Sequence, residues 1–196
     1  MDFKPVHIAS AGVLLIATAL LPLTVTAAAA QAFNQFIGFG DSTLDSGWYY
    51  THPHDTNPAL LALYNASRAV GGGIPTTVGG PMNSQVLASS FGLTAIPVGE
   101  PGGTNYAAGG ASNITYMSYT TLAPNTVSQM GTYLAGNGGV ANPNALYMIS
   151  SGGNDITQVI CPGGVCTNAT QMAQASAADL AAAIAQLHAA GGRYFV

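Results

Sequence analysis

The stretch Phe36-Ile37-Gly38-Phe39-Gly40-Asp41-Ser42 decides the fold of this chain, because it joins an apolar run to a glycine and two polar residues. The apolar side chains predict a buried strand, and Gly40 permits a tight bend at its end. Ser42 then lies where the strand ends, beside unpaired backbone N–H groups that can stabilise a developing negative charge. The same triplet is also typical of an ordinary turn, in which Asp41 or Ser42 caps a helix.

The amino terminus has the layout of a secretory signal peptide. A lysine precedes an apolar run over residues 11–23, and small residues follow as far as Ala32. A retained membrane anchor is the alternative, but a proline and a threonine interrupt the run, which is shorter than the roughly 20 apolar residues that span a bilayer. We expect a cleaved signal over 1–32, cut after Ala30 or Ala32, no membrane span afterwards, and export to the periplasm, cell surface or medium.

Composition restricts what the remaining residues, 33–196, can do. They are enough for one domain with a buried core. Only 5% of the chain is charged while 25 residues are glycine, so small and neutral polar side chains must form the surface. Three Lys and Arg residues offer phosphate backbones almost nothing to bind, which excludes nucleic acid as a partner. The net charge of -4 is too diffuse to indicate a cationic partner.

Two cysteines, Cys161 and Cys166, bracket the short segment Pro162-Gly163-Gly164-Val165. In an exported protein this spacing predicts a disulfide that closes a small surface loop, with two free thiols as the alternative. A metal site would need two further ligands, and no second pair of cysteines or histidines supplies them.

Hydrophobic periodicity divides the chain into alternating strands and helices. We expect helices over 81–91, 126–134 and 168–190, and further strands over 93–98, over 145–149 and from residue 194 onward. An aromatic segment at 48–56 and a glycine-rich one at 71–80 are expected to be loops that wall a cleft. The alternation predicts a mostly parallel sheet with helices on both faces, in which ligands bind at the carboxyl ends of the strands.

Three separated segments carry the residues of chemical interest. They are Phe39-Gly40-Asp41-Ser42, then Gly103-Thr104-Asn105-Tyr106-Ala107-Ala108-Gly109-Gly110-Ala111, then Ser151-Gly152-Gly153-Asn154-Asp155-Ile156. In order and spacing they resemble the first three sequence blocks of the GDSL lipases and esterases, also called SGNH hydrolases. The resemblance covers 36–196, and it implies a flavodoxin-like three-layer α/β/α sandwich with a mainly parallel sheet, incomplete at its C-terminus.

By this resemblance Ser42 is the nucleophile and also gives its backbone N–H to an oxyanion hole. The second donor is the backbone N–H of Gly110, with Gly109 as the alternative, and the third is the side-chain amide of Asn154. A glycine lets the backbone approach the substrate, and a neutral amide donates a hydrogen bond without adding a charge. The structural alternatives are a tight turn at the two glycines and a helix cap at Asn154.

Two acidic residues flank the serine in the first block. Asp41 and Asp45 are expected to hold the loop through local hydrogen bonds to the backbone, rather than to act on a substrate.

A serine nucleophile needs a general base, normally a histidine held by a carboxylate. The Asp-x-x-His block that supplies both in the family does not occur in this chain. His52 and His54 follow the nucleophile in a segment expected to be a solvated loop, and His188 falls on the expected long helix. We therefore expect 33–196 to be the amino-terminal part of a hydrolase domain, truncated before that block, and the isolated chain to be nearly inactive.

Other enzyme classes find little support in the sequence. Thr43 and Leu44 follow Ser42 and exclude the Gly-x-Ser-x-Gly elbow, and no glycine-rich phosphate cradle follows a strand. The resemblance implies hydrolysis of a small-molecule or lipid acyl ester through an acyl-enzyme, without metal or cofactor. The alternative is a secreted surface or adhesin-like module, or an inactive fragment, that keeps the fold without the chemistry.

Overall fold

The computed structural model describes residues 32–52, 58–73, 80–113, 123–158, 160–161, 164–165 and 167–196. The expected signal segment before Ala32 lies outside these residues, and so do His54 and Cys166. The predictions that concern them remain predictions.

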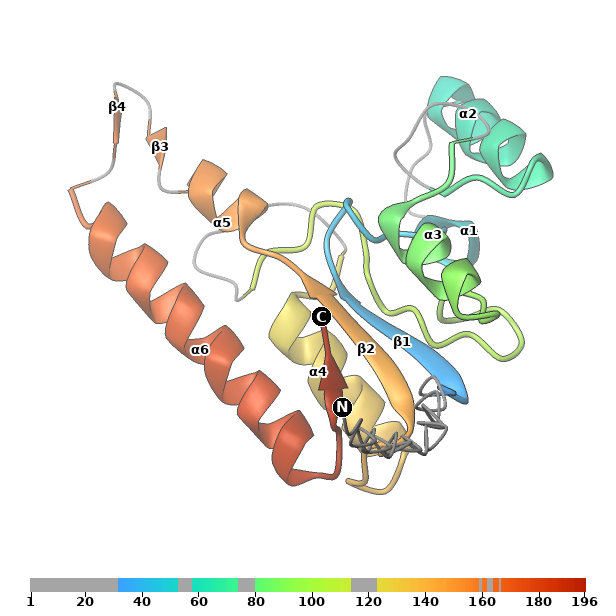
Figure 1. Cartoon of the computed structure of the whole chain (residues 1–196). Helices are drawn as coiled ribbons and strands as arrows, with labels where there is room; N and C mark the ends of the chain where they lie inside the picture. Colours follow the sequence, from blue (N-terminus) through green and yellow to red (C-terminus); the bar gives the residue numbers. More distant parts are fainter. Residues whose placement is uncertain are drawn as a thin grey trace, which may run out of the picture. The chain divides into compact units, whose positions relative to one another are not determined.

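The described part of the chain contains both strands and helices, and the helices α1 to α4 lie between the first two strands (Figure 1). In chain order the elements are β1 (Gln35–Gly40), α1 (Trp48–Thr51), α2 (Pro58–Ala69), α3 (Asn83–Ser90), α4 (Thr126–Gly136), β2 (Ala145–Ser150), α5 (Gly153–Gln158), β3 (Ile160–Cys161), β4 (Gly164–Val165), α6 (Ala169–Ala189) and β5 (Tyr194–Phe195). Within the described ranges, no helix is long and apolar enough to cross a bilayer.

The main sheet is parallel, with the strand order β1-β2-β5. β1 and β2 pair over their full length, from Gln35 opposite Ala145 to Gly40 opposite Ser150. On its other side β1 is joined by a single parallel bridge from Gly38 to Asn105. Because the paired strands run in the same direction, the residues that follow Gly40 and Ser150 emerge at the same edge of the sheet.

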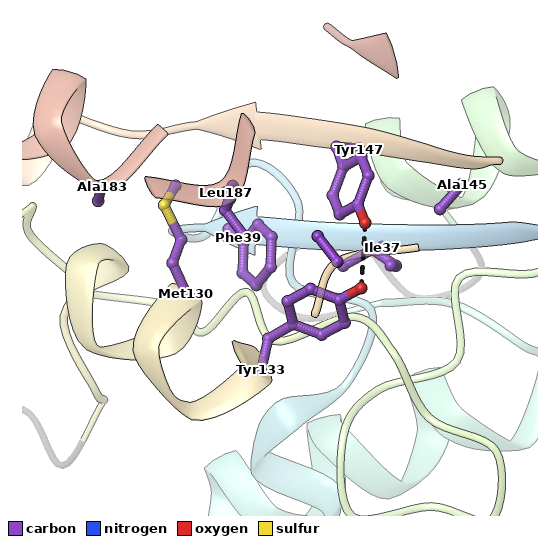
Figure 2. Close-up of a cluster of buried hydrophobic side chains, with 9 residues drawn as sticks. Ile37, Phe39, Met130, Tyr133, Ala145, Tyr147, Ala183 and Leu187 are labelled. Atoms are coloured by element: carbon purple, nitrogen blue, oxygen red, sulfur yellow. Dashed lines mark hydrogen bonds between the residues drawn. The ribbon is translucent and has the colours of Figure 1, made fainter. Parts of the chain in front are cut away.

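Helices cover both faces of this sheet, because successive strand residues point to opposite sides. On one face α4 and α6 pack against the strands (Figure 2), in a cluster of buried residues made of Ile37, Phe39, Met130, Tyr133, Ala141, Ala145, Tyr147, Ala183 and Leu187. On the other face Phe36 and Leu146 pack in one cluster with Ala88 of α3. The predicted α/β fold, with a parallel sheet between helices, is confirmed.

The helices expected over 81–91, 126–134 and 168–190 are confirmed as α3, α4 and α6. At the start of α3 the side-chain oxygen of Gln85 accepts from the Met82 N–H at 2.8 Å, and α4 begins where Asn125 Oδ1 accepts from the Ser128 N–H at 2.8 Å. α6 has no side-chain cap, but its 21 residues are rich in alanine, the best helix former.

Two local predictions are wrong. The segment 93–98 is not a regular strand: its one bridge joins Pro97 to Asn105, and a proline has no N–H to give to a ladder. The segment 48–56 is not wholly a loop, because Trp48–Thr51 forms the single-turn helix α1. The helix α2 has no counterpart among the expected elements.

Three hydrogen bonds close a ring inside the core, around the two tyrosines drawn in Figure 2. The Asn142 N–H donates to the Tyr133 hydroxyl at 3.1 Å, the two tyrosine hydroxyls lie 3.0 Å apart, and the Tyr147 hydroxyl donates to the Asn142 carbonyl at 2.9 Å. Burial raises the pKa of Tyr147, so its hydroxyl remains a donor. The ring ties α4 to β2 through the turn that precedes β2.

Replacing Tyr147 by phenylalanine tests this ring. The Tyr147→Phe variant keeps the aromatic packing but leaves the Asn142 carbonyl and the Tyr133 hydroxyl without one partner each. We expect the free energy of unfolding, measured by urea denaturation, to fall by about 1–3 kcal/mol. The matched control is Tyr194→Phe, whose side chain is 37% exposed, and which should change stability little. Equal stability of the two variants would contradict the role given to the ring.

Candidate active site

β1 ends in a bend that requires glycine. Gly40 has a φ of 149°, and a Cβ placed there would lie 1.9 Å from the Ser150 carbonyl oxygen of β2. The Gly40 carbonyl accepts from the Ala108 N–H at 3.0 Å, and the Asp41 N–H donates to the Ser150 carbonyl at 3.2 Å. The end of the first block is therefore bonded to both the second block and β2.

A tight turn follows this bend. The Leu44 N–H donates to the Asp41 carbonyl at 3.1 Å, and the Asp41 carboxylate accepts from the N–H and the hydroxyl of Thr43, each at 2.9 Å. Ser42 is half-buried, and within the described part of the chain neither its hydroxyl nor its N–H has a hydrogen-bond partner. Asp41 holds the loop as expected, whereas Ser42 does not serve as a cap.

Asp45 joins the first block to the second. Its side chain is fully buried. One carboxylate oxygen accepts from the N–H groups of Gly47 at 2.8 Å and Trp48 at 2.7 Å, and the other accepts from the Gly109 N–H at 2.7 Å. Burial raises the pKa of Asp45 to about 6, and the three N–H bonds oppose that rise. The loop role expected for Asp45 thus extends across the two blocks.

The bond from Asp45 separates the two candidate glycines. The Gly109 N–H is occupied by that carboxylate, whereas the Gly110 N–H has no partner among the described residues. A Cβ on Gly109 would lie 3.8 Å from the Ser42 Cβ, so this loop runs beside the serine. Gly110 has a φ of 87°, which side-chain-bearing residues rarely adopt. Within the described part of the chain, Gly110 is thus the one of the two whose N–H remains unpaired.

Asn154 lies in the first turn of α5, directly after the carboxyl end of β2. Its Nδ2 donates to the Ala111 carbonyl at 2.7 Å, which leaves the second amide proton for another acceptor. A Cβ on the neighbouring Gly153 would lie 3.9 Å from Asp41 Oδ2. Ser42, Gly110 and Asn154 therefore belong to three segments, two loops and the start of α5, that touch one another at the edge of the sheet.

A buried hydrogen-bond network holds the third block in place. The Asp155 carboxylate accepts from the Asn113 N–H at 2.9 Å and from the Ser176 hydroxyl at 2.6 Å, and Asn113 Nδ2 donates to that hydroxyl at 2.9 Å. These bonds link α5 to α6 and to the end of the second block. Asp155 thus orients the turn that carries Asn154.

No described histidine contacts Ser42. The His52 ring stacks on Trp48 with centroids 4.1 Å apart, and its Nδ1 lies 3.0 Å from the Trp48 carbonyl. His188 lies in the last turn of α6, with its ring 6.4 Å from Phe195. Since α6 packs antiparallel to the strands it connects, this turn lies at the opposite edge of the sheet from Ser42. Among the described residues, the Gly110 N–H and the Asn154 amide lie close to Ser42, but no histidine lies beside it.

The predicted disulfide falls partly outside the described residues. Cys161 lies in β3, which pairs with β4 as an antiparallel hairpin in which Cys161 is opposite Gly164. The bond between Cys161 and Cys166 stays a prediction.

One buried side chain beside the site was not expected. Gln129 of α4 is 1% exposed, and its amide bonds to both the N–H and the carbonyl of Gly40. The signal was present in the sequence, because Gln129 falls on the same helical stripe as Met130 and Tyr133. A polar residue on a buried stripe needs a partner, but nothing in the sequence identifies Gly40 as that partner.

The three N–H bonds to Asp45 can be tested with Asp45→Asn. The amide oxygen can still accept from Gly47 and Trp48, but the amide nitrogen then faces the Gly109 N–H as donor against donor. We expect the free energy of unfolding at pH 8 to fall by about 1–3 kcal/mol.

The pH dependence follows from the raised pKa. The pKa of about 6 in the folded state exceeds the ordinary aspartate pKa of 3.8, so the folded state binds an extra proton between these two pH values. The wild type should lose stability relative to the variant as the pH rises through this window. The control, Asp179→Asn on the exposed side of α6, should behave as wild type at pH 8. A D45N protein as stable as the wild type at pH 8 would contradict this role.

Residues 36–196 match the family of GDSL-like lipases/acylhydrolases. The chain is 29% identical over 195 residues to the "Uncharacterized protein in trpE-trpG intergenic region" of Pseudomonas putida, an alignment that covers 92% of this chain and 31% of that protein. It is 30% identical over 144 residues to "Lipase 1" of Photorhabdus luminescens, with 72% of this chain and 19% of that protein covered.

The chain thus spans less than a third of the length of each of these two relatives. The family match, in contrast, begins inside β1 and extends to the last residue of the chain. It covers well over half of the sequence, including all three blocks at the sheet edge, and the chain therefore belongs to the GDSL-like lipase/acylhydrolase family.

Proposed function

We propose that this protein is an exported ester hydrolase in which Ser42 attacks the acyl carbonyl and forms an acyl-enzyme. One observation carries the proposal: among the described residues, the hydroxyl and N–H of Ser42 have no partner, and they lie next to a loop with an unpaired Gly110 N–H and next to Asn154 with a spare amide proton. Membership of the family supports ester hydrolysis, and the signal-like amino terminus supports export.

In the proposed reaction the Ser42 oxygen adds to the ester carbonyl carbon, and the carbonyl oxygen becomes an oxyanion. Three N–H donors stabilise it: the backbone groups of Ser42 and Gly110 and the Asn154 amide. Each donor stabilises the transition state by roughly 3 kcal/mol in such a site, because the donors are fixed before the charge develops. Collapse of the adduct expels the alcohol, and water then hydrolyses the acyl-serine through the same oxyanion.

Neighbouring groups fix the positions of these donors. Asp45 holds the Gly109–Gly110 loop, and the Ala111 carbonyl holds the Asn154 side chain. The serine proton passes to a general base, which the described residues in contact with Ser42 do not supply. The base therefore comes from a part of the protein outside those contacts.

Fluorophosphonate labelling tests the nucleophile, because only an activated serine reacts with such a probe. In the full-length protein that the gene encodes, Ser42→Ala should abolish labelling. The control is Ser90→Ala: that serine is exposed on α3 with its hydroxyl on the Leu87 carbonyl, and its loss should leave labelling intact. No labelling of the wild type, or labelling that survives S42A, would favour the non-catalytic surface module.

Asn154→Ala tests the side-chain donor of the oxyanion hole. In the full-length protein, with a short-chain nitrophenyl ester, kcat should fall by about 10²–10³-fold while KM changes little, since the lost bond forms to the transition state. Asn154→Asp should lose as much, because a carboxylate cannot donate. The control, Asn144→Ala at an exposed turn before β2, should retain full kcat. An N154A loss confined to KM would argue against an oxyanion role.

A further inference from the structure

Gln129 makes peptide-like contacts with the last residue of β1. Its Oε1 accepts from the Gly40 N–H at 2.8 Å, and its Nε2 donates to the Gly40 carbonyl at 2.9 Å and to the Pro124 carbonyl at 2.9 Å. Both amide protons are therefore used, and the side chain is 1% exposed. In a regular sheet another strand would satisfy these groups of Gly40.

The clamped peptide lies two residues before the proposed nucleophile. The Gly40 carbonyl also accepts from Ala108 of the second block, and the next N–H, of Asp41, is bonded to Ser150. Ser42 itself makes no hydrogen bond within the described part of the chain. Its position is consequently set by the peptides before it and by the short turn that Asp41 closes.

We propose that Gln129 is a positioning residue for Ser42: from α4 it clamps the Gly40 peptide and so sets the direction in which the serine leaves the sheet. This proposal rests on the proposed function. Misplacing a reacting group by about 1 Å can cost 10²-fold in rate, so a clamp at the root of the loop acts on the rate without touching the substrate. A merely structural glutamine would change stability alone.

Two substitutions of similar size separate these roles. Gln129→Leu removes every hydrogen bond, and the rate constant for fluorophosphonate labelling of Ser42 should fall at least 10-fold. Gln129→Glu can still accept from Gly40 but, when ionised, places a carboxylate against the carbonyls of Gly40 and Pro124. A protonated carboxyl, in contrast, reproduces the amide by donating to one of those carbonyls.

The pH dependence of labelling is therefore diagnostic. The ratio of the Q129E to the wild-type rate should rise as the pH falls, whereas the ratio for Q129L should stay flat. His52 and Tyr106 line the same cavity of about 180 Å³ as Gln129. Q129L has no ionisable group at this position, so its ratio reports the pH effects that arise elsewhere in the protein.

The control for stability is Tyr147→Phe, which weakens the same core away from Ser42 and should label at the wild-type rate. Hydrogen exchange gives a readout independent of reactivity: amides in the peptide 40–44 should exchange faster in Q129L than in Y147F, while those of α6 should not differ. If the wild type is not labelled at Ser42, the proposed function fails, and the exchange result still decides whether Gln129 holds the loop.

The proposal is overturned if Q129L labels at the rate of Y147F with unchanged exchange over 40–44. It is also overturned if the Q129E ratio does not depend on pH. Should Q129L fail to fold, the Q129E comparison at low and high pH decides alone, because it uses one protein in two protonation states.

Discussion

A buried carboxylate holds the site together. Asp45 receives N–H groups from its own loop and from Gly109, so one side chain joins the segment after β1 to the glycine-rich segment in mid-chain. Burial raises its pKa to about 6, which shows that desolvation outweighs the bonds it accepts. Asp45 occupies the Gly109 N–H, whereas the N–H of the neighbouring Gly110 has no partner among the described residues.

Buried, uncharged side-chain amides also hold backbone groups in place in this chain, which has few charged residues. Asn105 is fully buried and donates to the Leu44 carbonyl and the Ser46 hydroxyl, and its oxygen occupies the space that a Cβ on Gly38 would need. Gln129 bonds to the N–H and the carbonyl of Gly40. The Asn105 amide thus fixes the loop after β1, and the Gln129 amide takes the place of a strand beside the last residue of β1. The polar interior therefore shapes the carboxyl end of β1, whereas the apolar interior holds the helices.

Patterns within one segment were enough to predict β1, β2 and the helices α3, α4 and α6, because hydrophobic spacing and caps are local properties. The prediction of a strand over 93–98 was wrong, because the apolar composition of this segment resembles a strand while Pro97 lacks the N–H that a strand ladder needs. α1 was missed because its first turn is supported by Asp45, a contact from outside the helix. The choice between Gly109 and Gly110 also stayed open in the sequence, since both glycines permit the same turn.

By itself the sequence determined the order of elements, the three blocks and the residue types suited to a serine and its donors, because these depend on local spacing and side-chain chemistry. Only the tertiary structure decided which N–H groups are free. Among the residues that the structure describes, the Gly109 N–H is bonded and the Gly110 N–H is not, Ser42 has no hydrogen-bond partner, and Asn154 donates one amide proton to the Ala111 carbonyl. Gln129 likewise acquires its contact with Gly40 only when α4 packs on β1. Hydrogen-bond occupancy depends on residues distant in the chain, and folding alone brings them within reach.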